Sequence, residues 1–151
     1  MWAWKGDKLV NTTMKKERIL IVGVELSTDT INIDNSMDEL EELVNAAMGK
    51  VIERIVQRRD SIDPAYFIVR GKAKEIKNFC EELDIDTVVF NDELSGAQLR
   101  NLEKIIDIKI IDRTNLILDI FANRASSKEG KLQVKLAQLK YRLPRLVGFR
   151  D

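Results

Sequence analysis

Short apolar runs alternate along this chain with longer segments in which apolar residues recur every three or four positions. The runs are bounded by polar or turn-forming residues, which is typical of strands, and they cover 19–24, 51–57, 66–69, 87–90 and 109–112. The first run is continuously apolar, as in a strand buried on both faces of a sheet. The second contains Glu53 and Arg54, so we expect it to be less fully buried.

Helices are expected between these runs. Apolar positions at helical spacing follow Ser36, Gly71 and Ser95. Ser36 is followed three residues later by Glu39, and Ser95 by Gln98, which is the pattern of a capping box at a helix start. Strands that alternate with helices indicate βαβ units. The pattern therefore predicts an α/β fold with a small, mostly parallel sheet and helices on its faces.

The α/β domain is expected to occupy 18–112. The preceding residues, 1–17, show no clear period, and a tag, a flexible lead and an edge strand are all compatible with them. They lack the apolar core and the small-residue cleavage site of a signal peptide. We therefore treat 1–17 as an N-terminal extension outside the domain.

The last segment, 113–151, differs in kind. It predicts one long basic helix from about Thr114 to Arg142, ended by Pro144 and followed by the start of a connecting loop. The apolar residues of this helix fall within an arc about 60° wide on a helical wheel. They are Leu118, Phe121, Ala125, Leu132, Leu136, Leu139 and Leu143. So narrow a seam needs a partner helix, and no further helical segment remains, so we expect the long helix to be one arm of a helical hairpin.

Charge is unevenly distributed along the chain. The 151 residues carry 25 Lys and Arg and 25 Asp and Glu, so the formal net charge is zero. Residues 112–151, however, carry a net charge of +5, which leaves −5 on the first 111 residues. An acidic body joined to a basic tail indicates a polyanionic partner.

Composition excludes several classes of function. The chain has no His, which removes His-based catalytic triads, proton shuttles and metal sites. Its single cysteine, Cys80, can form neither an internal disulfide nor a zinc cluster, so a reducing compartment is expected. No apolar run approaches the roughly 20 residues of a membrane span. We therefore expect a cytoplasmic protein without a membrane span that acts by binding.

Five cations line one side of the predicted long helix, in an arc beside the apolar seam. They are Arg124, Lys128, Lys131, Lys135 and Arg142. Such a stripe can neutralise successive phosphates of folded RNA or DNA. The alternative is a solvated helix face without a ligand.

A second candidate for anion binding is Val69-Arg70-Gly71-Lys72, at a predicted strand-to-helix junction. Backbone N–H groups at a helix N-terminus attract phosphate, and Gly allows it to approach closely. The first Gly and the final Ser or Thr of a P-loop are missing, however. Gly71 and Lys72 are therefore a weak phosphate-binding candidate, and a simple turn is the alternative.

Three segments of the chain resemble the N-terminal region of HflX-type GTPases. They begin with Asn91-Asp92-Glu93-Leu94-Ser95-Gly96, Asp112-Arg113-Thr114 and Glu129-Gly130-Lys131-Leu132-Gln133-Val134, and the resemblance extends over 18–148. HflX-type GTPases are cytoplasmic proteins that associate with the large ribosomal subunit and help to split or rescue stalled ribosomes. In that family an α/β domain precedes an antiparallel helical pair whose connecting loop reaches ribosomal RNA, and a GTPase domain follows. Lys135 departs from the family, which usually has Glu there, and so strengthens the basic stripe.

The resemblance implies a ribosome-binding accessory domain that contacts the RNA of the large ribosomal subunit. The residues expected to bind this rRNA are Arg124, Lys128, Lys131, Lys135, Arg142 and Arg145. The other expected partners are the GTPase domain and the second helix of a longer protein. GTP and magnesium would belong to that GTPase domain. Because its motifs are missing here, we expect no cofactor, metal site, catalytic residue or GTP hydrolysis in this chain.

Two other functions stay open. The α/β domain could be a small regulatory module that binds a nucleotide through Gly71 and Lys72. Alternatively, the apolar seam could join two copies of the chain in a homodimer.

Overall fold

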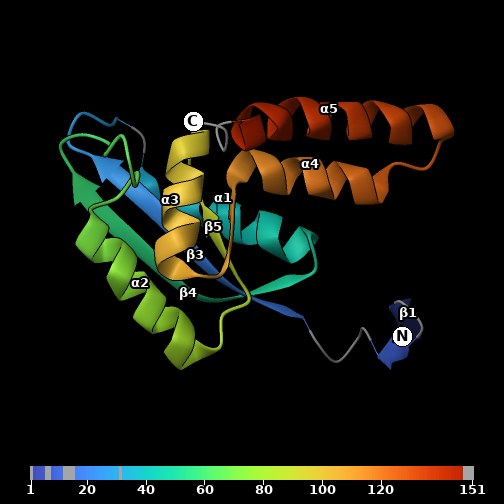
Figure 1. Ribbon diagram of the computed structural model, residues 1–151, viewed down its shortest axis with the longest axis horizontal. Helices are drawn as coiled ribbons and strands as arrows, with labels where there is room; N and C mark the ends of the chain where they lie inside the picture. The colour runs from blue at the N-terminus through green and yellow to red at the C-terminus, as the bar shows by residue number, and fades with distance from the viewer. Residues whose placement is uncertain (1, 6–7, 12–15, 31, 148–151) are drawn as a thin grey trace.

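The computed structural model describes residues 2–5, 8–11, 16–30 and 32–147. Its centre is a four-stranded sheet in the order β4-β3-β5-β6 (Figure 1). All neighbouring strands in this sheet run parallel, as predicted. The strands are β3 (Glu17–Leu26), β4 (Gly49–Arg59), β5 (Thr87–Phe90) and β6 (Lys109–Asp112).

Helices cover both faces of this sheet (Figure 1). On one face, α2 and α3 pack against Leu20 and Val22 of β3. On the other face, α1 and α4 pack against Ile19 and Ile21 of the same strand. Successive side chains of a strand point to opposite faces, so the continuous apolar run is buried on both sides, as predicted. The helices are α1 (Ile33–Ala46), α2 (Arg70–Leu83), α3 (Gly96–Ile106) and α4 (Arg113–Arg124).

One of the two predicted capping boxes is confirmed. The Gln98 N–H donates to Ser95 Oγ at 3.1 Å, and the Ser95 N–H donates to Gln98 Oε1 at 2.9 Å. The box predicted at Ser36 is wrong, because α1 begins earlier and is capped by Asn32, whose side chain accepts from the Asp34 N–H at 2.9 Å. The Ser36 hydroxyl instead accepts a hydrogen bond from Asn91 at 2.8 Å. A second good capping residue just upstream thus decided the start of α1.

The strand predicted over 66–69 is also wrong. Asp63 Oδ1 accepts from the N–H groups of Ala65 and Tyr66, both at 2.7 Å, and so bends the chain into a turn. Phe67 has a φ of 65°, which is incompatible with a strand. Phe67 and Ile68 are nevertheless buried in the core, which accounts for the apolar pattern.

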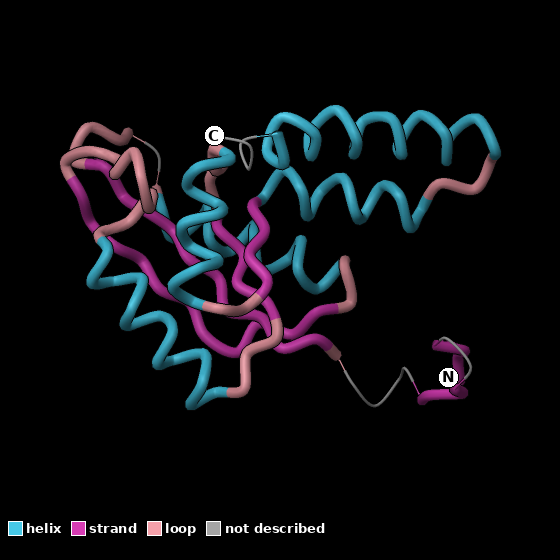
Figure 2. The backbone as a smooth tube through the Cα atoms, viewed as in Figure 1, coloured by secondary structure: helices cyan, strands magenta, loops and turns pink. Residues whose placement is uncertain are grey.

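The single helix expected from Thr114 to Arg142 is two helices. Helix α4 ends at Arg124, and α5 (Lys128–Val147) folds back against it to form a hairpin (Figures 1 and 2). Ala125 has extended backbone angles, which stop α4. Ser127 then caps α5, because its Oγ accepts from the Gly130 N–H at 2.9 Å. The long C-terminal helix is therefore shorter than predicted, and α4 lies beside it.

Helix α5 also continues through Pro144 to Val147, so the expectation that Pro144 ends the helix is wrong. Proline removes one backbone hydrogen bond from a helix interior. The next residue, Arg145, bonds to Glu93 and to the Leu94 carbonyl of the α/β body, and these contacts hold the last turn in place. These tertiary contacts thus outweigh the tendency of Pro144 to end the helix.

The N-terminal extension contains two strands, β1 (Trp2–Lys5) and β2 (Lys8–Asn11), and its last residue, Glu17, begins β3. Strands β1 and β2 pair with each other in antiparallel fashion and form a sheet separate from the central one. Figure 1 shows them apart from the α/β body. None of the described helices combines the length and the apolarity that a membrane span requires.

Candidate nucleic-acid interface on the helical hairpin

One side of α5 faces α4 and the α/β body. Gln138 donates from Nε2 to Asp119 Oδ1 of α4 at 3.0 Å. The Tyr141 hydroxyl donates to the carboxylate of Asp112, at the end of β6. Gln138 and Tyr141 are three residues apart, so they mark the same side of the helix.

The opposite side of α5 carries four leucines, which we call the leucine face. On a helical wheel their mean direction lies about 160° from that of Gln138 and Tyr141, so they point away from the body. Their exposed fractions are 70%, 52%, 51% and 52% for Leu132, Leu136, Leu139 and Leu143 respectively. The break between α4 and α5 separates this face from Leu118, Phe121 and Ala125, so the predicted seam is not one continuous line.

Four of the six predicted rRNA-binding cations lie near the turn of the hairpin. Arg124 ends α4, Lys128 and Lys131 lie in the first turn of α5, and Lys135 lies one turn further on; all four are exposed. Within the described residues, none of these four side chains is in an ion pair. We call Arg124, Lys128, Lys131 and Lys135 the cationic cluster. Four unpaired charges at one end of a helical hairpin form a surface suited to a polyanion.

The other two predicted cations are engaged elsewhere. Arg142 forms an ion pair with Asp119 at 2.9 Å and also bonds to Asn115 at 3.2 Å. Arg145 pairs with Glu93 at 2.8 Å, and only 16% of its side chain is exposed. The structure therefore places both arginines in contacts between α5 and the rest of the chain.

The weak phosphate-binding candidate lies in the first turn of α2, away from the hairpin (Figure 1). Lys72 forms an ion pair with Glu75 at 3.4 Å, three residues along the same helix. Gly71 is exposed, and a Cβ added there would meet no atom within 4 Å. The surroundings of Gly71 thus form no cradle, and the lysine is already neutralised.

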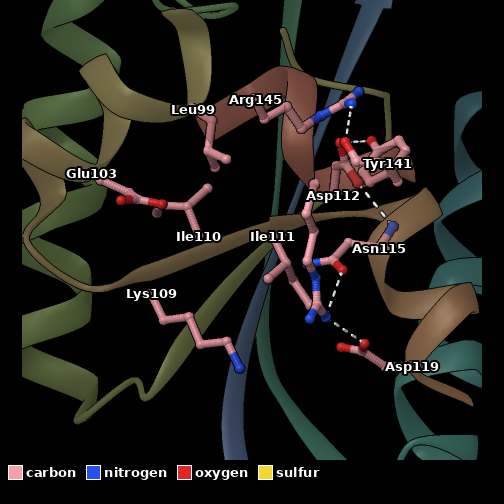
Figure 3. A pocket seen from close by; sticks show the side chains of 11 residues that line it. Leu99, Glu103, Lys109, Ile110, Ile111, Asp112, Asn115, Asp119, Tyr141 and Arg145 are labelled. Carbon is pink, nitrogen blue, oxygen red and sulfur yellow. Dashed lines mark hydrogen bonds and ion pairs between the residues drawn. The ribbon is translucent and has the colours of Figure 1, made fainter. Parts of the chain in front are cut away.

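A groove of about 360 Å³ lies between α3, β6, α4 and α5 (Figure 3). Burial raises the pKa of the Glu103 carboxyl on its α3 side. Burial and the hydrogen bond to Asp112 raise the pKa of the Tyr141 hydroxyl far above its usual range. Tyr141 therefore stays protonated at physiological pH and donates to Asp112. The bond between Tyr141 and Asp112 was not predicted from the sequence, although an Asp between a strand and a helix is a signal of an N-cap.

Two protein-family descriptions match the chain in succession. "GTP-binding GTPase N-terminal" matches residues 34–122, and "GTP-binding GTPase Middle Region" matches residues 124–151. The boundary falls in the last turn of α4, just before the turn of the hairpin. The first match therefore contains β4, β5, β6 and most of α4 but not β3, and the second contains α5.

Curated relatives named "GTPase HflX" cover almost the whole chain. The protein from Caldanaerobacter subterraneus subsp. tengcongensis is 49% identical over 145 residues, which are 96% of this chain and 33% of the relative. The protein from Escherichia coli is 42% identical over 131 residues, which are 87% of this chain and 30% of the relative. The chain thus spans about a third of the length of these relatives.

Solved structures show the same arrangement of elements. A GTP-binding protein from the hyperthermophilic archaeon Sulfolobus solfataricus, in complex with GDP, matches with a TM-score of 0.67 at 28% identity, over 90% of this chain and 40% of that chain. The SsGBP variant G235P matches with a TM-score of 0.69 at 28% identity, over 91% of this chain and 42% of that chain. Together with the family match over 34–122, these findings show that the chain belongs to the HflX family of GTP-binding proteins and corresponds to their N-terminal region.

Proposed function

We propose that this chain is the ribosome-binding N-terminal domain of an HflX-like GTP-binding protein, and that it serves the splitting or rescue of ribosomes in the cytoplasm. The observation that carries the proposal is the cationic cluster, four exposed cations at the turn of the hairpin that form no ion pair with any residue the structure describes. They would contact phosphates of large-subunit rRNA. Phosphate contacts position a protein on RNA without reading its sequence, which suits a domain that docks on one particle.

The charge distribution supports a one-sided contact. Residues 1–111 carry a net charge of −5, so an RNA surface would repel the α/β body and attract the hairpin. The sheet and its helices would then act as a rigid mount for the cationic cluster. Arg142 and Arg145 would contribute less than predicted, because Asp119 and Glu93 already neutralise them.

The salt dependence of binding tests this proposal. With four phosphate contacts, the logarithm of the affinity for purified 50S particles should fall against the logarithm of the salt concentration with a slope of about −3. Between 50 and 200 mM KCl, the affinity measured by cosedimentation should therefore fall about 60-fold. Binding that is independent of salt, or absent at 50 mM KCl, would contradict rRNA recognition by these cations.

GTP and magnesium would belong to the GTPase domain of the full-length protein, where GTP hydrolysis takes place. The described residues of this chain do not fit them. Lys72 pairs with Glu75, and no P-loop surrounds it. Within the described residues, no group of three Asp, Glu or Cys side chains could hold a metal ion. The contacts of Gly71 and Lys72 thus give no support to a nucleotide-binding module.

The leucine face would receive the second helix of the longer protein. It points away from the body and is at least half exposed along its whole length. An antiparallel helix laid on it would bury the narrow apolar stripe that such packing requires. A second copy of the chain is the alternative partner.

A double substitution distinguishes these partners. We expect Leu136→Lys with Leu139→Lys to change the free energy of unfolding of this chain by no more than about 0.5 kcal/mol, because both side chains face solvent. Urea denaturation measures the change. The control is Val134→Lys, which lies on the half-buried side and should cost about 1 to 3 kcal/mol. A large loss in the double variant, with an unfolding midpoint that depends on protein concentration, would show instead that copies pair through the leucine face.

A further inference from the structure

A buried carboxylate holds the end of α5 that lies nearest the sheet. Asp112 is 4% exposed and accepts three hydrogen bonds. The donors are the Leu94 N–H at 3.0 Å, the Asn115 N–H at 2.9 Å and the Tyr141 hydroxyl. Leu94 precedes α3, Asn115 lies in the first turn of α4, and Tyr141 belongs to α5. One carboxylate therefore joins three helices to the end of β6, and Figure 3 shows Asp112 between Asn115 and Tyr141.

Arg145 reinforces this junction with its whole guanidinium group. Nη2 pairs with Glu93 at 2.8 Å, Nε donates to the Leu94 carbonyl at 3.2 Å, and Nη1 donates to the Tyr141 carbonyl at 2.8 Å. The guanidinium also lies 3.5 Å from the centroid of the Tyr141 ring. Every guanidinium nitrogen thus has a partner within the chain, which leaves Arg145 poorly placed to bind phosphate.

The backbone of α5 also approaches α3 directly. A Cβ added to Gly96 would lie 3.1 Å from both Cα and the carbonyl oxygen of Arg145. That same carbonyl accepts a hydrogen bond from Arg100 Nη1 at 3.0 Å. Contacts this close leave little freedom for α5 to shift relative to α3.

We propose that Asp112, Tyr141, Arg145 and Glu93 form a latch that fixes the angle between α5 and the α/β body, with Arg145 as a positioning residue. Tyr141 and Arg145, the latch residues of α5, lie toward the opposite end of the helix from the cationic cluster, 6 to 17 residues from its lysines. It therefore keeps the distant cations in one orientation relative to the sheet. The consequence for RNA binding rests on the proposed function, whereas the consequence for geometry does not.

The distance between two spin labels, measured by pulsed electron–electron double resonance, tests whether the angle between α5 and the α/β body is fixed. Spin labels would be attached to Lys74→Cys on α2 and Gln133→Cys on α5, both exposed positions. Cys80 is 2% exposed, and burial raises the pKa of its thiol to about 11, so it should remain unlabelled at neutral pH. A protein without the two added cysteines provides the control for labelling. The doubly labelled protein with an intact latch should give one narrow distance distribution.

Opening the latch should broaden that distribution. Tyr141→Phe removes only the hydroxyl that bonds to Asp112, and Arg145→Ala removes the guanidinium; both should broaden it, while Lys135→Ala should not. Circular dichroism would confirm that each variant is folded. If Arg145→Ala fails to fold, Tyr141→Phe decides the matter. Unchanged widths in the folded latch variants would overturn the latch.

Binding to 50S particles separates a positioning residue from a phosphate ligand. Arg145→Ala should weaken binding without changing the salt slope, and a latched population reduced to about a tenth would weaken it about tenfold. Lys135→Ala should instead reduce the slope by about one. A similar loss of slope in Arg145→Ala would make Arg145 a phosphate ligand and overturn its positioning role. If the parent does not bind 50S particles at all, the proposed function fails, while the distance measurement still decides the latch.

Discussion

Replacement of Lys128, Lys131 and Lys135 by Glu is expected to reduce binding of this chain to the large ribosomal subunit at least about a hundredfold at 100 mM salt. The variant removes three of the four charges of the cationic cluster and places three carboxylates opposite the phosphates. All three side chains are exposed and none is in an ion pair within the described residues, so the fold should not change. Cosedimentation with purified 50S particles measures the loss.

The matched control changes the same net charge elsewhere. Lys50, Lys74 and Lys104 are exposed lysines of the α/β body, and their replacement by Glu lowers the net charge of the protein by the same amount. This control should bind within about threefold of the parent, because screening limits the reach of distant charges to about 10 Å. Equal losses in the two triple variants would mean that overall charge, and not the cationic cluster, governs binding.

The central sheet was predictable because local sequence determines it. The run 19–24 is apolar at every position except Gly23, and the structure places its residues alternately on the two faces of β3. A strand in this position has no polar side to present to solvent. Its burial between two layers of helices could therefore be inferred from sequence alone.

The hairpin was not predictable from periodicity. The seven-residue interval from Ala125 to Leu132 is close to two helical turns, so the apolar pattern kept its phase across the three-residue break. The low helix propensity of Ser126, Ser127 and Gly130 was a local sign of the break. The hairpin is determined by the packing of α5 against α4. The hydrogen bond between Gln138 and Asp119, which joins the two helices, connects residues 19 positions apart in the sequence.

Contacts between residues far apart in the sequence also decided which of the predicted cations are free of ion pairs within the described residues. In the structure Lys128, Lys131 and Lys135 are exposed, and their binding to rRNA stays a prediction, because the stripe follows only from helical spacing. It could not predict the pairing of Arg142 and Arg145, whose carboxylate partners lie 23 and 52 residues away in the sequence. Long-range pairs of this kind depend on how elements pack, which helical spacing does not encode.

Asp112→Ala is expected to destabilise the chain by about 3 to 5 kcal/mol, the largest effect on folding among the polar residues discussed. The substitution removes the N-cap of α4 and leaves the Leu94 N–H and the Tyr141 hydroxyl without their acceptor. Each such loss typically costs about 1 to 3 kcal/mol when the donor is buried. Urea denaturation monitored by circular dichroism measures the free energy of unfolding.

Two comparisons show whether this loss comes from the junction or from charge alone. Asp112→Asn removes the charge but keeps an acceptor for the cap of α4, so it should cost only about 1 to 2 kcal/mol. Asp119→Ala removes a carboxylate that is about one-third exposed and accepts from both Arg142 and Gln138, and it should cost no more than about 2 kcal/mol. If Asp112→Ala is no worse than Asp119→Ala, then Asp112 does not join the three helices as its contacts indicate. If it is much worse, a single carboxylate at the end of β6 supports both the helix that follows it and the attachment of α5.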